Sequence, residues 1–285
     1  MKALPQYLQA VFWMFGTLIA LSLMGIAARE LSEIYNTVQI LFVRNVAGFA
    51  VILALMLQLG TGIVRTQRVW MHGWRNLCHI SAVGCWFYGI SVLPLAEVFV
   101  LESTLPIWVV ILAVPFLRER FTSYRLVAVL LGFAGILVIL RPGVAIIDPV
   151  ALIVLLGAML FGGANVFTKA LTRTEGPMTI LFWMFLLQLL MASVAISSYG
   201  IFLPHGHYWL WVIAIGLTGL AAHYCTACSL SLADAGLVTP LHYLRVPLIA
   251  WLGWLIYDET ADIWLWIGAG IIFAGTMVNV RGEKK

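Results

Sequence analysis

The sequence predicts an all-α integral membrane protein of ten transmembrane helices, arranged as two inverted five-helix repeats with both termini in the cytoplasm. Three observations lead to this fold class: an apolar composition, ten apolar segments of membrane-spanning length, and an internal repeat. Of the 285 residues, 63% are apolar and 10% are charged, against roughly half and a quarter in soluble domains.

The internal repeat relates positions of the two halves at one constant offset, without a gap. Ile40-Leu41-Phe42 returns as Ile180-Leu181-Phe182, and Phe133-Ala134-Gly135 returns as Phe273-Ala274-Gly275. We therefore predict one repeat over residues 1–142 and a second over 143–285. Each half contains five apolar segments, and an odd number of spans turns the second half upside down relative to the first.

Ten mostly apolar segments are long enough to cross a hydrocarbon core of ~30 Å, which takes about 20 helical residues. They are predicted at residues 8–28, 36–59, 74–93, 95–117, 124–141, 149–170, 178–200, 208–231, 236–257 and 263–281. The first lies close to the N-terminus, as a signal peptide would, but it is longer than a signal core and is needed to match the second half. The short connections leave no room for a soluble catalytic or nucleic-acid-binding domain, so nucleic acid is not an expected partner.

Basic residues indicate the orientation, because Lys and Arg gather in cytoplasmic loops. Counting spans from the N-terminus, Arg29 and Arg141 fall on one side, while Arg44 and Arg245 lie inside spans. The other side collects Lys2, Arg65, Arg68, Arg75, Arg118, Arg120, Arg125, Lys169, Arg173, Arg281, Lys284 and Lys285. This bias predicts that both termini are cytoplasmic.

The two arginines inside spans are the first candidates for function. A charged group in a bilayer usually faces a cavity or a partner, and guanidinium suits a carboxylate or phosphate. Arg44 and Arg245 are therefore predicted to be a pair that lines a central cavity and binds or gates an anion. The alternative is that each is neutralised by a carboxylate or by helix carbonyls and only locks two spans together. Pro240 and Pro247 bracket Arg245; proline frees backbone groups and interrupts a span, although a kinked packing helix would show the same pattern.

Glu102 is the acidic candidate, and Pro106 follows it shortly in the same span, so this helix is predicted to bend near Glu102. The offset of the repeat places Glu102 opposite His242 across the two halves. Glu102 could hold a substrate amine, pair with Arg44, or titrate. With Glu102, His242 is predicted to hold the cation or a proton, which makes protons a candidate coupling ion.

Other polar and aromatic side chains within the spans complete the candidate site. His79 and His223 can donate, accept or titrate, although a histidine in a span is more often a helix–helix hydrogen bond. Deep aromatic rings could stack on a solute or hold a cation, although they more often only pack. The remaining candidates are Trp86, Tyr88, Asn165, Tyr224 and Tyr243, with Trp108, Trp183 and Trp251 also deep in spans. Glycines are predicted to mark close helix packing at Gly132, Gly135, Gly268, Gly270 and Gly275.

Neither a cofactor nor a metal is expected. Cys225 and Cys228 form a C-x-x-C in the middle of an apolar segment, without the strand-to-helix context of a redox motif, so buried apolar cysteine is the better interpretation. A metal site using His79 and His223 has weak support. No phosphate-binding loop is present, which argues against ATP-driven pumping. An intramembrane enzyme and a non-transporting sensor subunit are remote alternatives, because the sequence offers neither a good catalytic set nor a signalling domain.

Several segments resemble the EamA family of the drug/metabolite transporter superfamily, with one unit per half. They are Phe42-Val43-Arg44, the Pro106 span ending in Leu117-Arg118-Glu119-Arg120, and Gly132-Phe133-Ala134-Gly135-Ile136. Thr239-Pro240-Leu241-His242-Tyr243-Leu244-Arg245 is similar to the Pro-Tyr-Arg-Tyr segment of S-adenosylmethionine uptake carriers, with Leu241-His242 replacing Tyr-Arg. The resemblance implies ten helices around a central cavity, with the third, fourth, eighth and ninth spans near the substrate.

Together these observations predict a multi-pass secondary transporter or exchanger of the bacterial cytoplasmic membrane. It would work as a monomer or homodimer and move a small, amino-acid-like metabolite, with S-adenosylmethionine as one candidate, by alternating access. An amino acid or drug exporter of the same fold is the alternative. Arg245→Ala is expected to abolish transport and leave the chain folded.

Overall fold

The computed structural model describes residues 5–117, 123–140, 148–200, 203–233, 238, 241–242, 245–259 and 262–283. Within these ranges the regular secondary structure is helical throughout. The helices are α1 (Gln6–Leu31), α2 (Thr37–Leu59), the short 3-10 helix η1 (Thr61–Val64), α3 (Val69–Val92), α4 (Leu95–Glu102), α5 (Leu105–Leu117), α6 (Ser123–Leu140), α7 (Pro149–Leu171), α8 (Pro177–Ile196), α9 (Tyr208–Leu232), α11 (Arg245–Tyr257) and α12 (Ile263–Glu283).

Local signals explain where these helices start. Asn36 caps α2 in a capping box with Gln39, so two backbone N–H groups at the helix start are satisfied. The Asp148 side chain accepts from the backbone N–H of Val150 at the start of α7. Pro149 and Pro177 occupy the first turns of α7 and α8, where proline removes no helical hydrogen bond.

The fourth predicted span is interrupted directly beside its charged residue. α4 ends at Glu102 and α5 begins at Leu105, with Pro106 in the first turn of α5. Proline cannot donate a backbone hydrogen bond or continue the preceding helix, which explains why the break falls here. The predicted bend near Glu102 is therefore confirmed.

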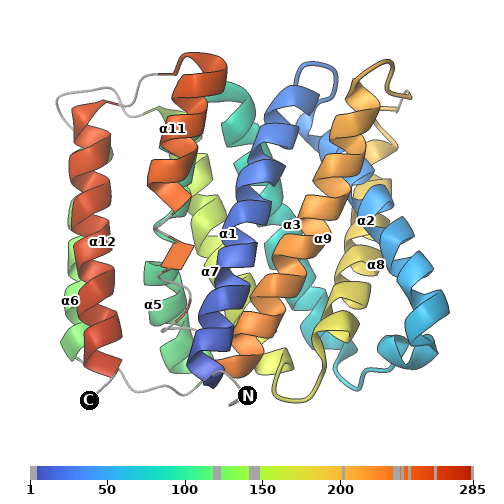
Figure 1. The fold of residues 1–285 in the computed structure, drawn as a ribbon, viewed down its shortest axis with the longest axis horizontal. Coiled ribbons are helices and arrows are strands. Elements are labelled where there is room, and N and C mark those ends of the chain that lie inside the picture. The colour runs from blue at the N-terminus through green and yellow to red at the C-terminus, as the bar shows by residue number, and fades with distance from the viewer. Residues whose placement is uncertain are drawn as a thin grey trace.

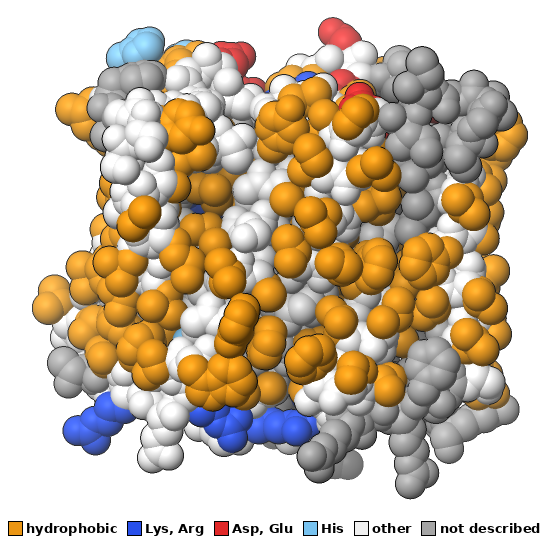
Figure 2. Space-filling view, turned by 180° about the vertical axis from the view of Figure 1, so that it is seen from behind, with side chains coloured by type: hydrophobic (Ala, Val, Ile, Leu, Met, Phe, Trp, Pro, Cys, Tyr) orange, Lys and Arg blue, Asp and Glu red, His pale blue; other side chains and the backbone are white. Residues whose placement is uncertain are grey.

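The surface is that of a membrane protein. Six helical segments are long and apolar enough to cross a bilayer, namely α1, α2, α4 with α5, α7, α8 and α9. Figure 2 shows a broad apolar band, with Lys and Arg side chains gathered along the lower edge. α1 begins and α12 ends at that same edge (Figure 1). A multi-pass helical membrane protein is thus confirmed, whereas the count of ten spans and the cytoplasmic position of the termini stay predictions.

Helices of the two halves pack against one another in equivalent pairs. α1 lies along α9, and α7, at the corresponding place in the second half, lies along α3 (Figure 1). α2 packs on α8, and α6 packs on α12. Gly135 and Gly268 allow α6 and α12 to approach closely, because a Cβ on either would lie 2.8 Å from the carbonyl oxygen of the other. Gly270 faces open space, so the predicted packing role is wrong for that glycine.

Two basic residues that are copies of each other make the same contact in each half. The Arg29 guanidinium donates to the carbonyl oxygens of Ile90 and Leu93, at the end of α3. The Lys169 ammonium donates to the carbonyl oxygens of Leu230 and Ala233, at the end of α9, each at 3.0 Å. All three positions are related by the offset of the internal repeat. A basic side chain thus satisfies the last carbonyls of one helix in each half.

Candidate functional site

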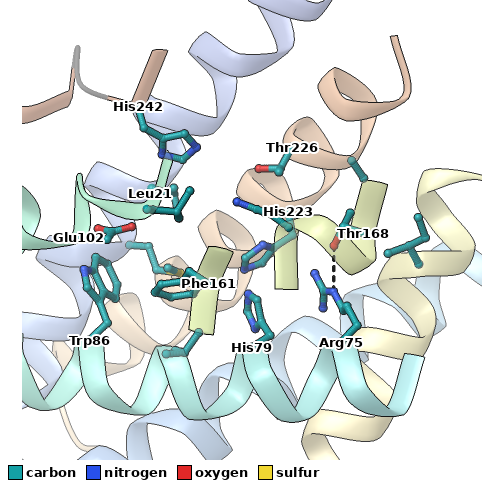
Figure 3. Close-up of a pocket in the computed structure, with 16 residues that line it drawn as sticks. Leu21, Arg75, His79, Trp86, Glu102, Phe161, Thr168, His223, Thr226 and His242 are labelled. Atoms are coloured by element: carbon teal, nitrogen blue, oxygen red, sulfur yellow. Dashed lines mark hydrogen bonds between the residues drawn. The ribbon is translucent and has the colours of Figure 1, made fainter. Parts of the chain in front are cut away.

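A pocket in the middle of the helical bundle is lined by side chains from both halves of the chain. Its empty space, counted out to its open mouth, is about 630 Å³. The lining residues are Leu21, Met24, Arg75, His79, Val83, Trp86, Glu102, Leu105, Phe161, Asn165, Thr168, Ile180, His223, Thr226, Ala227 and His242. Figure 3 shows Trp86, His79 and Arg75 projecting from α3 toward one side, with His223 and Thr226 of α9 facing them.

A polar face on α3 forms one wall of this region. His72, Arg75, Asn76 and His79 are all buried, and their spacing of three and four residues places them on one side of a helix. His72 turns to Glu175, with its Nε2 atom 2.7 Å from a carboxylate oxygen. Arg75 and His79 line the pocket.

Arg75 was predicted to be one of the basic residues at the cytoplasmic face, and the structure corrects this prediction. The helix begins at Val69, earlier than the predicted 74, so Arg75 lies more than a turn inside and is only 4% exposed. Its Nε donates to the Thr168 hydroxyl at 3.2 Å, and its Nη1 donates to Asn76 Oδ1 at 2.9 Å.

Arg44 lies behind the pocket wall, without any exposed surface. Its Nη2 donates to His223 Nε2 at 2.9 Å, and its Nη1 donates to Gln188 Oε1 at 3.3 Å. The prediction that Arg44 and Arg245 form one pair lining the cavity is therefore wrong. Arg44 meets the pocket lining through its hydrogen bond with His223.

Gln188 of α8 joins these groups into one network. Its Nε2 donates to Asn76 Oδ1 and to His79 Nδ1, each at 2.9 Å, while its Oε1 accepts from Arg44. Neither Gln188 nor Asn76 was among the predicted site residues. Gln188 could have been found from the sequence as a single uncharged amide in the middle of an apolar span. Asn76 could have been found from its place on the polar face of α3.

Glu102, which lines another part of the pocket, forms a buried ion pair with Arg245, which is not one of the lining residues. The alternative in which Glu102 pairs with Arg44 is therefore wrong. The Arg245 guanidinium carbon also lies 4.4 Å from the centre of the Phe99 ring, a cation–π distance. Nε and Nη1 of Arg245 are buried and have no hydrogen-bond partner among the described residues, so within these residues Glu102 and the ring satisfy this cation only in part.

Of the other predicted site residues, Trp86, Asn165 and His242 also line the pocket. Tyr88 is 41% exposed on the outer surface of α3, and Tyr224 stacks edge-on against Trp13, 5.6 Å away. Neither lines the pocket, and the same holds for Trp108, Trp183 and Trp251. Pro240 and Tyr243 lie outside the described residues, and Pro247 stands in the first turn of α11.

The cysteines are free thiols inside helices. Cys78, Cys85 and Cys225 are partly buried and Cys228 is buried. Across the described part of the chain, no group of three or more His, Cys, Asp or Glu side chains is arranged to hold a metal ion. The pocket thus presents guanidinium, imidazole, amide and carboxylate groups beside aromatic and aliphatic walls.

Known proteins that this chain resembles are membrane transporters. The riboflavin transporter of Rhizobium johnstonii is 30% identical over 281 residues, which cover 96% of this chain and 91% of that one. The S-adenosylmethionine uptake transporter of Rickettsia felis is 25% identical and covers 99% of this chain and 96% of its own. The pseudopaline exporter of Pseudomonas aeruginosa is 26% identical, with 93% of each chain covered.

A solved structure and a family model agree with the similarity to these relatives. A solved crystal structure with 19% sequence identity superposes with a TM-score of 0.74 over 97% of this chain and 99% of that one, which shows a common fold. The model of the EamA-like transporter family matches residues 8–141 and again residues 149–281. Since these two matches span nearly the whole sequence, the chain belongs to the EamA-like transporter family.

Proposed function

We propose that this protein is a secondary active transporter or exchanger that moves a small organic metabolite across the bacterial cytoplasmic membrane by alternating access. One observation carries the proposal: the central pocket is lined by α1, α3, α4 and α5 of the first half and by α7, α8, α9 and His242 of the second. Transporters built from inverted repeats hold their solute where the halves meet.

The polarity of the pocket supports a solute pathway. Ionisable side chains inside a bilayer are costly and mark substrate or ion routes. His79, Glu102 and His242 are almost entirely buried and yet line the same pocket. Such groups are retained where a polar solute replaces the water they would otherwise bind.

The relatives suggest which solutes to test first. They are named for riboflavin, S-adenosylmethionine and pseudopaline, and the names include both uptake and export. Trp86 and Phe161 supply ring faces beside polar groups in the pocket. We propose an amino-acid-like metabolite, with S-adenosylmethionine as the first candidate and export of an amino acid or drug as the alternative.

The test is counterflow in proteoliposomes. Vesicles preloaded with unlabelled S-adenosylmethionine are diluted into labelled S-adenosylmethionine, and amino acids and riboflavin are added as competitors. Transient accumulation of label identifies the substrate. Accumulation with labelled riboflavin or an amino acid instead keeps the transporter and changes its solute, whereas no flux of any solute contradicts the proposal.

Two substitutions on α1 separate the pocket from the lipid surface. Leu21 lines the pocket, whereas Leu23 is 50% exposed on the outside of the same helix. Leu21→Trp fills the pocket and is expected to abolish flux, while Leu23→Trp adds the same bulk toward lipid and leaves flux intact. Equal flux in both variants would move the pathway away from this pocket.

A further inference from the structure

We propose that Arg75, His79 and His223 form an oxyanion-binding subsite in the central pocket, which takes a carboxylate or phosphate group of the solute. This inference rests on the proposed transport function and specifies the chemistry of its solute. The three side chains face one another from α3 and α9 (Figure 3), and the centres of the two imidazole rings are 4.5 Å apart. Their polar atoms can therefore reach a single small group.

His79 presents a hydrogen-bond donor to the pocket. Its Nδ1 accepts from the Gln188 amide, because the Gln188 oxygen is occupied as an acceptor of Arg44. A neutral imidazole that accepts at Nδ1 carries its proton at Nε2. That Nε2 is buried and has no hydrogen-bond partner among the residues that the structure describes, although the ring lines the pocket and is only 3% exposed.

His223 presents a donor for the same reason. Its Nε2 faces Arg44 Nη2 at 2.9 Å, and a guanidinium can only donate. The proton of neutral His223 must then be on Nδ1, which no protein group within the described ranges accepts. Arg44 and Gln188 act as positioning residues, since they fix the tautomers of His223 and His79 without lining the pocket.

Arg75 adds the charge. Nε and Nη1 are held by Thr168 and Asn76, so the guanidinium is fixed in direction, while Nη2 has no hydrogen-bond partner in the described part of the chain. The subsite therefore offers donors from all three residues. Acceptor-only groups such as carboxylate and phosphate match a donor-only site, and charge assistance strengthens these hydrogen bonds.

The region also lacks a counter-ion. Among the residues that the structure covers, the salt bridges of carboxylates go to Arg29, His72 and Arg245, and none goes to Arg44 or Arg75. Burying cations away from water without a counter-charge costs several kcal/mol per ion. A bound oxyanion supplies the missing charge. This observation separates the subsite from the Glu102–Arg245 pair, which is already neutralised.

The rest of the pocket indicates the body of the solute. Arg75 and Trp86 are eleven positions apart on α3, or roughly 16 Å along a helix. Between them lie Val83 and the Phe161 ring. An elongated metabolite with an oxyanion at one end and an apolar or aromatic body fits this arrangement.

The experiment measures oxyanion binding to the purified full chain in detergent. The thermal unfolding midpoint and the tryptophan fluorescence are recorded against sodium phosphate and sodium succinate, with sodium chloride at matched ionic strength as the reference. We expect saturable stabilisation by at least one oxyanion. Arg75→Gln should weaken that binding about 10- to 100-fold, as the loss of a charge-assisted hydrogen bond implies. A response to phosphate alone or to succinate alone identifies the group.

Gln188→Glu tests the tautomer argument without removing a pocket residue. A carboxylate at position 188 supplies a counter-charge to Arg44, so the unliganded protein should stay folded. It cannot donate to His79 Nδ1, so the His79 proton moves to Nδ1 and the donor at Nε2 is lost. Oxyanion binding should fall about tenfold or more, while Arg173→Gln, on the exposed cytoplasmic-side loop, should bind as the unmodified protein does.

The subsite would be overturned if oxyanions had no effect on the unmodified protein, or if Arg75→Gln and Gln188→Glu bound oxyanions as tightly as the unmodified protein does. Counterflow distinguishes this failure from failure of the proposed function. Flux of a solute that lacks an oxyanion, unchanged in Arg75→Gln, rejects the subsite and keeps the transporter. Oxyanion binding without flux of any solute keeps the subsite and rejects the proposed transport function.

Discussion

At the residue scale, the ion pair of Glu102 and Arg245 is the contact whose loss should lower the stability of the protein most. Both side chains are buried, and removal of one partner leaves the other charge uncompensated. Loss of one member of such a pair typically costs about 3–5 kcal/mol. Arg245→Ala is therefore expected to lower the stability of the protein as well as its flux, which thermal unfolding in detergent will show.

The double variant Glu102→Gln with Arg245→Gln is the matched control. It removes both charges, so we expect it to recover most of the stability that Arg245→Ala loses. A single Arg245→Ala variant as stable as the original chain, but without flux, would assign Arg245 to the solute rather than to the fold. That outcome is what the sequence by itself led us to expect.

The candidate residues show how far a sequence reveals such a site. Six predicted residues line the pocket: His79, Trp86, Glu102, Asn165, His223 and His242. The polar ones were selected because such groups are few within the spans, and Trp86 because a deep ring could stack on a solute. Arg75 was missed because an arginine near the end of a span is usually interfacial. Because α3 starts at Val69, Arg75 lies inside the helix and not at its end. The helical spacing of His72, Arg75, Asn76 and His79 would have revealed this position.

At the element scale, the capping of α3 and α9 by Arg29 and Lys169 should stabilise both helix ends. Each basic side chain donates to two carbonyl groups at a helix C-terminus, where the last carbonyls of a helix lack the usual i+4 donor. Hydrogen bonds from charged groups contribute about 1.5–3 kcal/mol. Arg29→Met should therefore lower the thermal unfolding midpoint, and Lys169→Met should do the same at the other end of the molecule.

Arg173→Met is the control for this prediction. Arg173 is exposed just beyond α7, so its replacement removes one positive charge without exposing a helix end. Its unfolding midpoint should match that of the unmodified protein. If Arg29→Met behaves in the same way as Arg173→Met, the carbonyl groups at the end of α3 are satisfied by water and the cap is dispensable.

The elements themselves were predictable to different degrees. The break beside Glu102 follows from Pro106, a local signal that does not depend on the rest of the fold. The contact of Gly135 with Gly268 follows from small residues on two apolar helices. The pairing of α1 with α9 and of α3 with α7 depends on how the two halves dock, which no single segment encodes.

At the scale of the whole molecule, the two halves make equivalent contacts at opposite places in the bundle. The carbonyl cap at the end of α3 and its copy at the end of α9 are related by the internal repeat. In transporters built from inverted repeats, equivalent packing allows one half to rock against the other with similar interfaces, and the alternating access that we propose for this protein depends on it. The inverted arrangement predicts which loops face the cytoplasm.

Two exposed loop positions test this orientation in intact bacterial cells. Arg173, between α7 and α8, lies on the predicted cytoplasmic side, and His205, between α8 and α9, lies on the other side. In a background where the four native cysteines are replaced, a membrane-impermeant thiol reagent should label His205→Cys in intact cells. It should label Arg173→Cys only after the cells are permeabilised.

The gathering of Lys and Arg at the edge where α1 begins and α12 ends (Figure 2) is the physical reason for this expectation, because basic loops are retained in the cytoplasm. Labelling of Arg173→Cys alone from outside would mean that the orientation of the whole molecule in the membrane is the reverse of the predicted one. Labelling of both positions would mean that an even number of spans separates them, which would remove α8 from the membrane. Since Gln188 lies on α8 and orients the polar network beside the pocket, that result would also remove the basis for the oxyanion subsite.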